Sequence, residues 1–321
     1  MRHNRWYGDM PLWKEYAGHF PEGYRITAGR EPREEYWPWN GNQIHLDLYE
    51  NLKAPAKVIL LHGVGGNGRV LSFIAAPLCS MGYEVIAPDL PGYGLTRMNQ
   101  RSWDYRSWIS MAEALVEREA QRDDRPIVLF GLSAGGMLAY QVASRADAVR
   151  AVAATCFLDF REPEVLAASA TSPKMARFGL PILRRLAKVM PMLTLPMKAV
   201  ANSRALANNE ELLDLLIKDR TSAGARVPLA LVASMSHTSP PVEPEQFSDK
   251  PVLLVHPQKD RWVDLRLSRF FFDRLACEKE LVILEGAGHL PNELPGLEQM
   301  RTAMERFLAN VAQRGRGGGS C

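Results

Sequence analysis

The chain has 321 residues, 46% of them hydrophobic, and a formal net charge of +3 at neutral pH. This length and apolar content favour one α/β domain that carries an insertion over two independent domains. The near balance of charge, without an arginine–aromatic repeat, argues against nucleic acid as a partner. We expect a cytoplasmic protein, because no apolar run reaches the roughly 18 residues of a membrane span and the N-terminus lacks the apolar stretch of a signal peptide.

The first 50 residues predict an arm followed by a hairpin. Residues 1–35 are rich in aromatic side chains without clean periodicity, and we expect them to pack against the domain as an N-terminal arm. Residues 35–40 and 43–49 flank Gly41-Asn42 and predict an antiparallel hairpin. His45 falls in the polar phase of the second run, so we expect it to be an exposed strand residue.

The next part of the chain alternates short apolar runs with helical patterns. Strands are predicted at 58–61, 84–87 and 125–130, and helices at 70–81, 103–121 and 137–143. This alternation predicts an α/β fold with a doubly wound, mainly parallel sheet. In such sheets the site lies at the carboxyl ends of the strands, which is where Gly63, Asp89 and Ser133 fall.

A glycine-rich turn follows the third of these strands, with the sequence Gly131-Leu132-Ser133-Ala134-Gly135-Gly136. A serine at a sharp strand-to-helix turn presents its hydroxyl at the end of the strand. The turn requires nearly side-chain-free residues two positions before and after the serine, and Gly131 and Gly135 meet that need. Ser133 is therefore a candidate nucleophile, against the alternative of an ordinary tight turn.

These motifs resemble those of the α/β-hydrolase family. The matching segments, in family order, are His62-Gly63, residues 89–94, the serine turn, residues 251–260 and residues 281–289. Pro257 stands where many members have glycine. The resemblance implies a mostly parallel sheet of about eight strands with a helical cap insertion. It places the core at 36–156 and 249–312 and the cap at 157–248. Residues 313–321 are rich in glycine, and we expect them to form a flexible tail.

The resemblance also implies a catalytic triad of Ser133, His289 as base and Asp260 as acid. Asp264 is a second candidate for the acid, although it matches the family position less well. The backbone N–H groups of Val64 and Ala134 would form the oxyanion hole. His62 and Asp89 are interpreted as structural residues of their loops.

Three residues beside these positions, Gly63, Trp262 and Leu290, are candidate substrate contacts. We expect no metal and no cofactor. The four cysteines (Cys79, Cys156, Cys277 and Cys321) lack metal-ligand spacing, and we expect them to be reduced and mostly buried.

The predicted insertion combines helical patterns with one-signed charge. Helices are predicted near 164–170, 174–190, 195–207, 210–218 and 228–235. Between Val165 and Asn209 there is no acidic residue but there are seven basic ones, namely Lys174, Arg177, Arg184, Arg185, Lys188, Lys198 and Arg204. This segment could lie over an acidic part of the core, or it could contact anionic lipid.

The function expected from these features is hydrolysis of a carboxylic ester of a lipophilic or acyl-chain substrate through an acyl-enzyme on Ser133. A lactonase, for example on acyl-homoserine lactones, a thioesterase or a carbon–carbon bond hydrolase would use the same residues. A ligand-binding protein that has lost catalysis is the rival from another class. Epoxide hydrolases and dehalogenases are disfavoured because they carry aspartate where this chain has Ser133. The sequence leaves the oligomeric state open.

Overall fold

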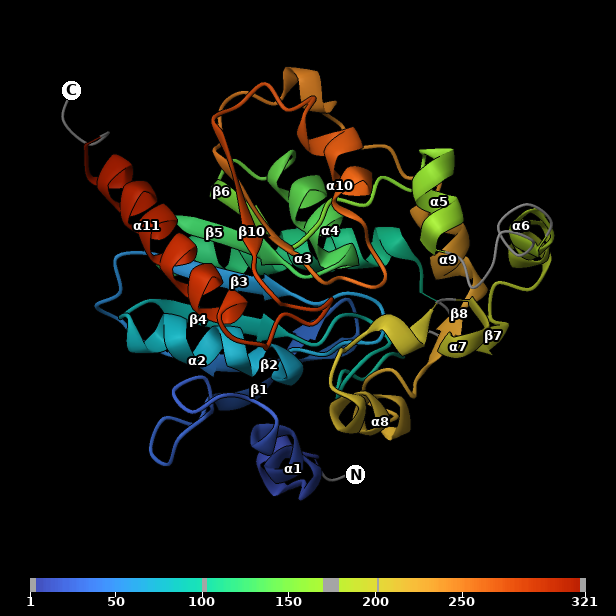
Figure 1. Cartoon of the computed structure of the whole chain (residues 1–321), viewed down its shortest axis with the longest axis horizontal. Helices are drawn as coiled ribbons and strands as arrows, with labels where there is room; N and C mark the ends of the chain where they lie inside the picture. The colour runs from blue at the N-terminus through green and yellow to red at the C-terminus, as the bar shows by residue number, and fades with distance from the viewer. Residues whose placement is uncertain (1–3, 100–102, 170–178, 201, 318–321) are drawn as a thin grey trace.

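The computed structural model describes residues 4–99, 103–169, 179–200 and 202–317, and its centre is an eight-stranded sheet (Figure 1). The strand order is β1-β2-β4-β3-β5-β6-β9-β10. The β1–β2 hairpin and the β2–β4 pair are antiparallel, and every other neighbouring pair is parallel. The strands span Arg33–Trp39 (β1), Asn42–Tyr49 (β2), Lys57–Leu61 (β3), Glu84–Pro88 (β4), Ile127–Gly131 (β5), Val149–Ala154 (β6), Val252–Pro257 (β9) and Lys279–Leu284 (β10).

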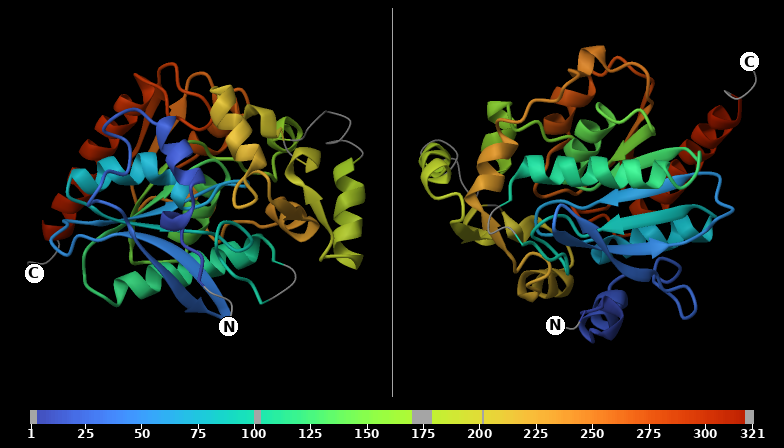
Figure 2. Two further views of the ribbon diagram at one scale, coloured as in Figure 1. Left: turned by 90° about the horizontal axis from the view of Figure 1, so that it is seen from below. Right: turned by 180° about the vertical axis from the view of Figure 1, so that it is seen from behind.

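Helices cover both faces of this sheet (Figures 1 and 2). Helices α2 (Ser72–Ser80) and α11 (Gly296–Gly317) pack together on one face, and α3 (Tyr105–Ala120) and α4 (Ala134–Ala143) pack on the other. Helix α10 (Leu265–Phe272) lies beside α4, where Phe271 meets Tyr140 edge-on. Every residue of β3, β4, β5 and β9 is buried, which explains why apolar residues predominate in their sequences. The predicted doubly wound, mostly parallel sheet is confirmed.

Residues 157–248 connect β6 to β9 and hold most of the remaining helices. They comprise α5 (Pro163–Ser169), α6 (Leu180–Val189), β7 (Thr194–Pro196), α7 (Met197–Val200), α8 (Glu210–Lys218), β8 (Arg226–Pro228) and α9 (Leu229–Met235), with 3₁₀ turns at Ser203–Ala205 and Pro244–Gln246. We call this segment the insertion.

Two predictions from the sequence need correction here. The helix predicted at 195–207 is wrong in its first part, because Thr194–Pro196 forms a short strand that pairs antiparallel with β8. The tail predicted from 313 is helical as far as Gly317, where α11 ends, and Arg314 pairs with Glu278 at 2.7 Å. Residues 174–178 of a predicted helix, including Lys174 and Arg177, lie outside the described residues, as does Cys321.

The N-terminal arm contains a short helix, α1 (Leu12–Gly18), and packs against the core through buried aromatic rings. The hydroxyl of Tyr7 donates to Asp89 at 2.9 Å, and that of Tyr16 donates to Asp219 of the insertion at 3.2 Å. The ring of Phe20 packs on Phe73 of α2. No helix within the described ranges is long and apolar enough to cross a membrane.

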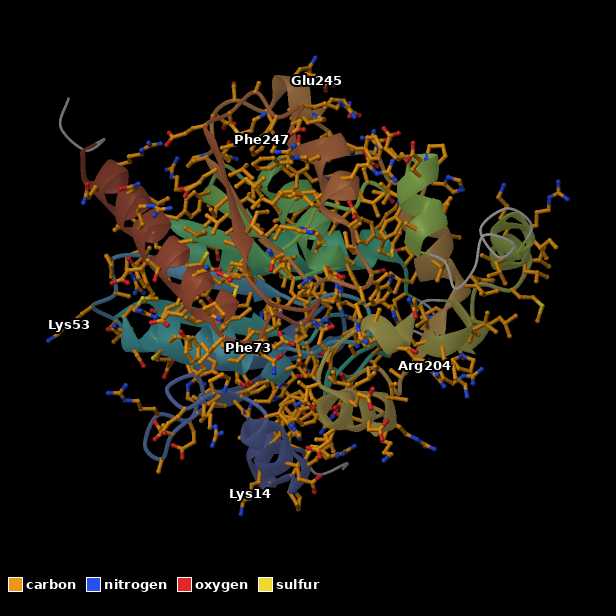
Figure 3. The ribbon with its side chains drawn as sticks, viewed as in Figure 1. Lys14, Lys53, Phe73, Arg204, Glu245 and Phe247 are labelled. Atoms are coloured by element: carbon orange, nitrogen blue, oxygen red, sulfur yellow. The ribbon has the colours of Figure 1, made fainter. Side chains whose placement is uncertain are left out.

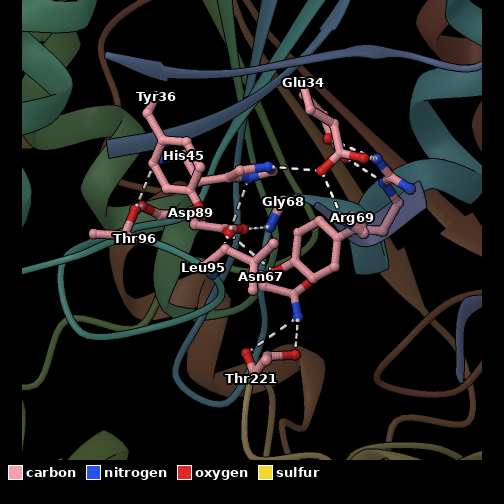
Figure 4. A network of polar contacts seen from close by, with 12 residues as sticks. Glu34, Tyr36, His45, Asn67, Gly68, Arg69, Asp89, Leu95, Thr96 and Thr221 are labelled. Carbon is pink, nitrogen blue, oxygen red and sulfur yellow. Dashed lines mark hydrogen bonds and ion pairs between the residues drawn. The ribbon is translucent and has the colours of Figure 1, made fainter. Parts of the chain in front are cut away.

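The prediction that His45 is exposed is wrong, because the arm covers the outer face of β2. The side chain is fully buried, and Nε2 lies 2.8 Å from Glu34 while Nδ1 lies 3.1 Å from Asp89 (Figure 4). A carboxylate on each ring nitrogen requires a proton on both. Burial alone would lower the pKa of His45, but the charges and hydrogen bonds of Asp89 and Glu34 raise it to about 10.

A second cation completes this buried network. The guanidinium of Arg69 contacts Asp47 at 2.5 Å and Glu34 at 3.0 Å. Glu34, His45 and Asp47 lie close enough to suggest a metal site. Arg69 and the charged His45 already supply positive charge to these carboxylates, so the cluster is satisfied by the chain itself.

We expect His45→Gln to lower the free energy of unfolding by about 3–5 kcal/mol near pH 6, because it leaves the buried carboxylate of Asp89 without its cation. The folded-state pKa of His45 is raised to about 10, so its contribution is complete below the unfolded value of about 6.5 and is lost as the pH rises towards 10. Urea unfolding at several pH values should show a difference from wild type that shrinks with rising pH. His237→Gln, at an exposed position, is the control. A difference that grows with pH would refute this account.

Candidate active site

Ser133 lies at the turn between β5 and α4 in a strained backbone conformation. Its φ is 57°, and Asn40 is the one other non-glycine with positive φ in the described ranges. A Cβ at Gly131 would lie 2.1 Å from the carbonyl oxygen of Gly135, and one at Gly135 would lie 2.1 Å from that of Leu61. The turn therefore accepts only glycine at these two positions, for the reason expected from the sequence.

His289 and Asp260 lie next to Ser133, although each comes from a different loop. The turn after β9 carries Asp260 and the loop after β10 carries His289. Nε2 of His289 is 2.9 Å from Oγ of Ser133, and Nδ1 is 2.8 Å from Oδ2 of Asp260. The structure thus brings the three predicted residues into one hydrogen-bonded chain.

Asp260 is held as a carboxylate by its surroundings. Burial would raise its pKa, but the charge and hydrogen bond of His289 and the backbone N–H groups of Val263 and Trp262, each at 2.8 Å, lower it below the usual range. Asp264, the second candidate acid, instead accepts the N–H of Arg266 and caps α10. It has no contact with His289 among the hydrogen bonds of the described residues.

His62 is a structural residue, as expected. Burial lowers its pKa to about 4, so the ring is neutral. Its Nε2 accepts the N–H of Leu90 at 2.9 Å, which leaves Nδ1 to donate to the carbonyl of Gly63 at 2.8 Å. Asp89 likewise accepts the N–H groups of Gly68 and Leu95 and is fully buried in its turn.

Two backbone N–H groups beside Ser133 are available to a bound ligand. Those of Val64 and Ala134 have no acceptor among the hydrogen bonds of the described residues. Gly63 lies close to the serine turn, because a Cβ added to it would be 2.9 Å from Cβ of Ser133 and 3.2 Å from N of Ala134. Such N–H pairs can stabilise an oxygen that becomes negative.

Ser133 lies in a pocket whose lining is mostly apolar. Of the predicted contacts, Gly63 and Leu290 line it, whereas Trp262 packs its ring on His289 with 4.9 Å between centroids. The insertion contributes Leu206 and Leu216. Sequence reasoning missed these two leucines, whose only signal was a position in apolar stretches of the insertion.

Sequence reasoning also missed the polar residues that hold the site in place. The N–H of Ser133 donates to Oγ1 of Thr155 at 3.0 Å. Ser222 of the insertion donates to the carbonyl of Gly65 at 2.7 Å, and Asn67 donates to the carbonyl of Thr221 at 3.1 Å (Figure 4). These bonds fix the loop that carries Val64 to the insertion.

The chain is similar to known proteins in both sequence and structure. The model of the family described as "Alpha/beta hydrolase family" matches residues 58–300. Pimeloyl-[acyl-carrier protein] methyl ester esterase from Neisseria meningitidis is 27% identical over 247 residues, which are 74% of this chain and 72% of that protein. The magnesium-chelatase 30 kDa subunit from Rhodobacter capsulatus is 36% identical over 121 residues, so the chain spans only 40% of that relative's length.

Solved structures share the fold at lower identity. The monoacylglycerol lipase of Paleococcus ferrophilus has a TM-score of 0.67 and 21% identity, with 84% of this chain and 99% of that one covered. A soluble variant of monoglyceride lipase from Saccharomyces cerevisiae has a TM-score of 0.70 and 18% identity, with 91% and 99% covered.

Proposed function

This chain belongs to the alpha/beta hydrolase family, and from that premise we propose that it is a serine hydrolase that cleaves a carboxylic ester of a lipophilic or acyl-chain substrate. The observation that carries the proposal is the hydrogen-bonded chain from Ser133 through His289 to Asp260, at 2.9 and 2.8 Å. A serine hydroxyl becomes a competent nucleophile when a base lies within hydrogen-bond reach and a third group orients that base.

In the first half of the proposed reaction, Oγ of Ser133 attacks the ester carbonyl while Nε2 of His289 takes its proton. Asp260 holds the Nδ1–H of the imidazole and stabilises the imidazolium. The negative oxygen of the tetrahedral intermediate accepts the N–H groups of Val64 and Ala134. The C–O bond to the alcohol then breaks, the alcohol leaves with the proton from Nε2, and the acyl group stays on Ser133.

In the second half, His289 takes a proton from water as the water attacks the acyl-enzyme. Breakdown of this second intermediate releases the carboxylic acid and returns the proton to Ser133. The apolar lining of the pocket, with Leu206, Leu216 and Leu290, supports an acyl chain as the bound part of the substrate. Similarity to an esterase and to lipases supports an ester as the bond that is cleaved.

A panel of p-nitrophenyl esters of increasing chain length, beside lactones and thioesters with the same acyl groups, tests this function. We expect the esters to be hydrolysed fastest, with kcat/KM rising up to about fourfold per added CH₂ until the pocket is full. Leu206→Phe narrows the pocket, so it should shift the optimum to shorter chains and leave acetate hydrolysis unchanged. Preference for lactones or thioesters would favour those alternatives. Absence of turnover on every class would favour a ligand-binding protein.

A further inference from the structure

Exposed apolar side chains gather on one short segment of the insertion. In the described part of the chain, eight large hydrophobic residues are exposed, and five of them fall between 182 and 192. They are Ile182, Leu186 and Val189 of α6 together with Met190 and Met192 of the following turn, and Val189 is 82% exposed. We call these five residues, with Arg185 and Lys188, the α6 surface.

Helix α6 has one covered side and one uncovered side. Ala187 is buried and the helix packs against α9. Ile182, Leu186 and Val189 follow the i, i+4, i+7 spacing and therefore form a stripe on another side. Figures 1 and 2 show α6 at the margin of the molecule, away from the central sheet. No described residue covers the stripe, so its apolar side chains are exposed to solvent. A gathering of exposed apolar side chains on a protein surface is typical of an interaction site.

Basic side chains border the stripe. Arg185 and Lys188 are exposed, and neither forms an ion pair with any described residue. No acidic residue occurs from 165 to 209, so no carboxylate of this segment itself offsets their charge. Arg204 is also exposed and lies on the same side of the molecule (Figure 3). An acidic patch of the core, the alternative considered from the sequence, does not cover these two side chains.

We propose that the α6 surface docks on a membrane surface that contains anionic lipids. A helix that lies in the interface inserts an apolar stripe at the boundary of headgroups and acyl chains, while flanking basic side chains meet the lipid phosphates. The α6 surface offers both features on a helix at the margin of the molecule. An acidic protein would satisfy the charges but would need a matching groove for the apolar stripe, so a bilayer fits better.

The same surface is connected to the candidate active site. From α6 the chain runs through β7 to Met197. The side chain of Met197 packs against Gly65, since a Cβ added to Gly65 would lie 2.4 Å from its Sδ. Gly65 belongs to the loop beside Ser133. Docking through α6 would thus bring the insertion side of the pocket towards lipid, a consequence that rests on the proposed function. Docking itself does not rest on the proposed function, because vesicle binding is measured without turnover.

Co-sedimentation tests docking with two kinds of vesicle, one of phosphatidylcholine and one of phosphatidylcholine and phosphatidylglycerol in equal parts. The wild-type chain should bind the anionic vesicles and bind the neutral ones weakly. The double variant Ile182→Ser/Val189→Ser should lose about tenfold or more of this binding. Arg185→Glu/Lys188→Glu should lose about 100-fold at low salt, and the loss should fade as salt screens the charges.

The matched control is Leu52→Ser/Lys53→Glu, which makes the same kinds of chemical change at two adjacent exposed residues. Lys53 lies on the opposite side of the molecule (Figure 3). This control should bind vesicles like wild type. Equal losses in the control and the α6 variants would overturn the proposal. So would unchanged binding in the serine variant, since the apolar stripe would then take no part in the contact, and so would a lowered melting temperature without loss of binding.

Discussion

Replacing Ser133 by alanine should abolish both hydrolysis of the best ester and labelling by a fluorophosphonate probe. The change removes Oγ of Ser133, the proposed nucleophile, which lies 2.9 Å from Nε2 of His289. Loss of the nucleophile in a serine hydrolase reduces kcat by about 10⁶-fold. Stability should be unchanged, because the strained turn is held by backbone contacts and by the N–H of Ser133, which alanine keeps.

Steady-state rates and gel-based probe labelling measure this outcome. Ser144→Ala is the matched control, since Ser144 lies at the other end of α4, where its hydroxyl donates to the backbone carbonyl of Tyr140. It should keep full labelling and turnover. Labelling that survives in Ser133→Ala would defeat the assignment of the nucleophile.

Asp260→Asn should lower kcat by about 10⁴-fold while the protein folds normally. An amide in place of the carboxylate can no longer accept the Nδ1–H of His289 with full charge, so the imidazole loses its orientation and its stabilised charged form. The backbone N–H groups of Trp262 and Val263 can still donate to the amide oxygen, which preserves the turn.

Asp264→Asn is the matched control for this variant. Asp264 caps α10, and asparagine is an equally good capping residue. Activity and melting temperature should therefore stay near wild type. Measurement of kcat for both variants on the same ester distinguishes the two candidate acids. A larger loss of kcat in Asp264→Asn than in Asp260→Asn would identify Asp264 as the acid of the triad.

Much of the fold could be predicted because its signals are local. Residues 58–61 and 85–87 are continuously apolar since both faces of their strands are covered by helices. The Ser133 turn was recognisable because its geometry excludes side chains at Gly131 and Gly135, a demand that the sequence displays directly.

The features that sequence reasoning missed depend on distant contacts. His45 alternates like an exposed residue, but the arm covers it and two distant carboxylates neutralise its charge. Thr155 and Ser222 acquire their roles only when β6 and the insertion are placed beside the site. Strands β7 and β8 have three residues each, too few for a periodic pattern, and they form because they pair with each other.

The most direct test of the central claim is to identify the residue that reacts. The intact chain is labelled with a fluorophosphonate, digested, and sequenced by tandem mass spectrometry. We predict one adduct, on the peptide that contains Ser133, with much slower formation in Asp260→Asn and unchanged formation in Asp264→Asn. An adduct on any other residue, or none in a preparation that hydrolyses esters, would contradict the account.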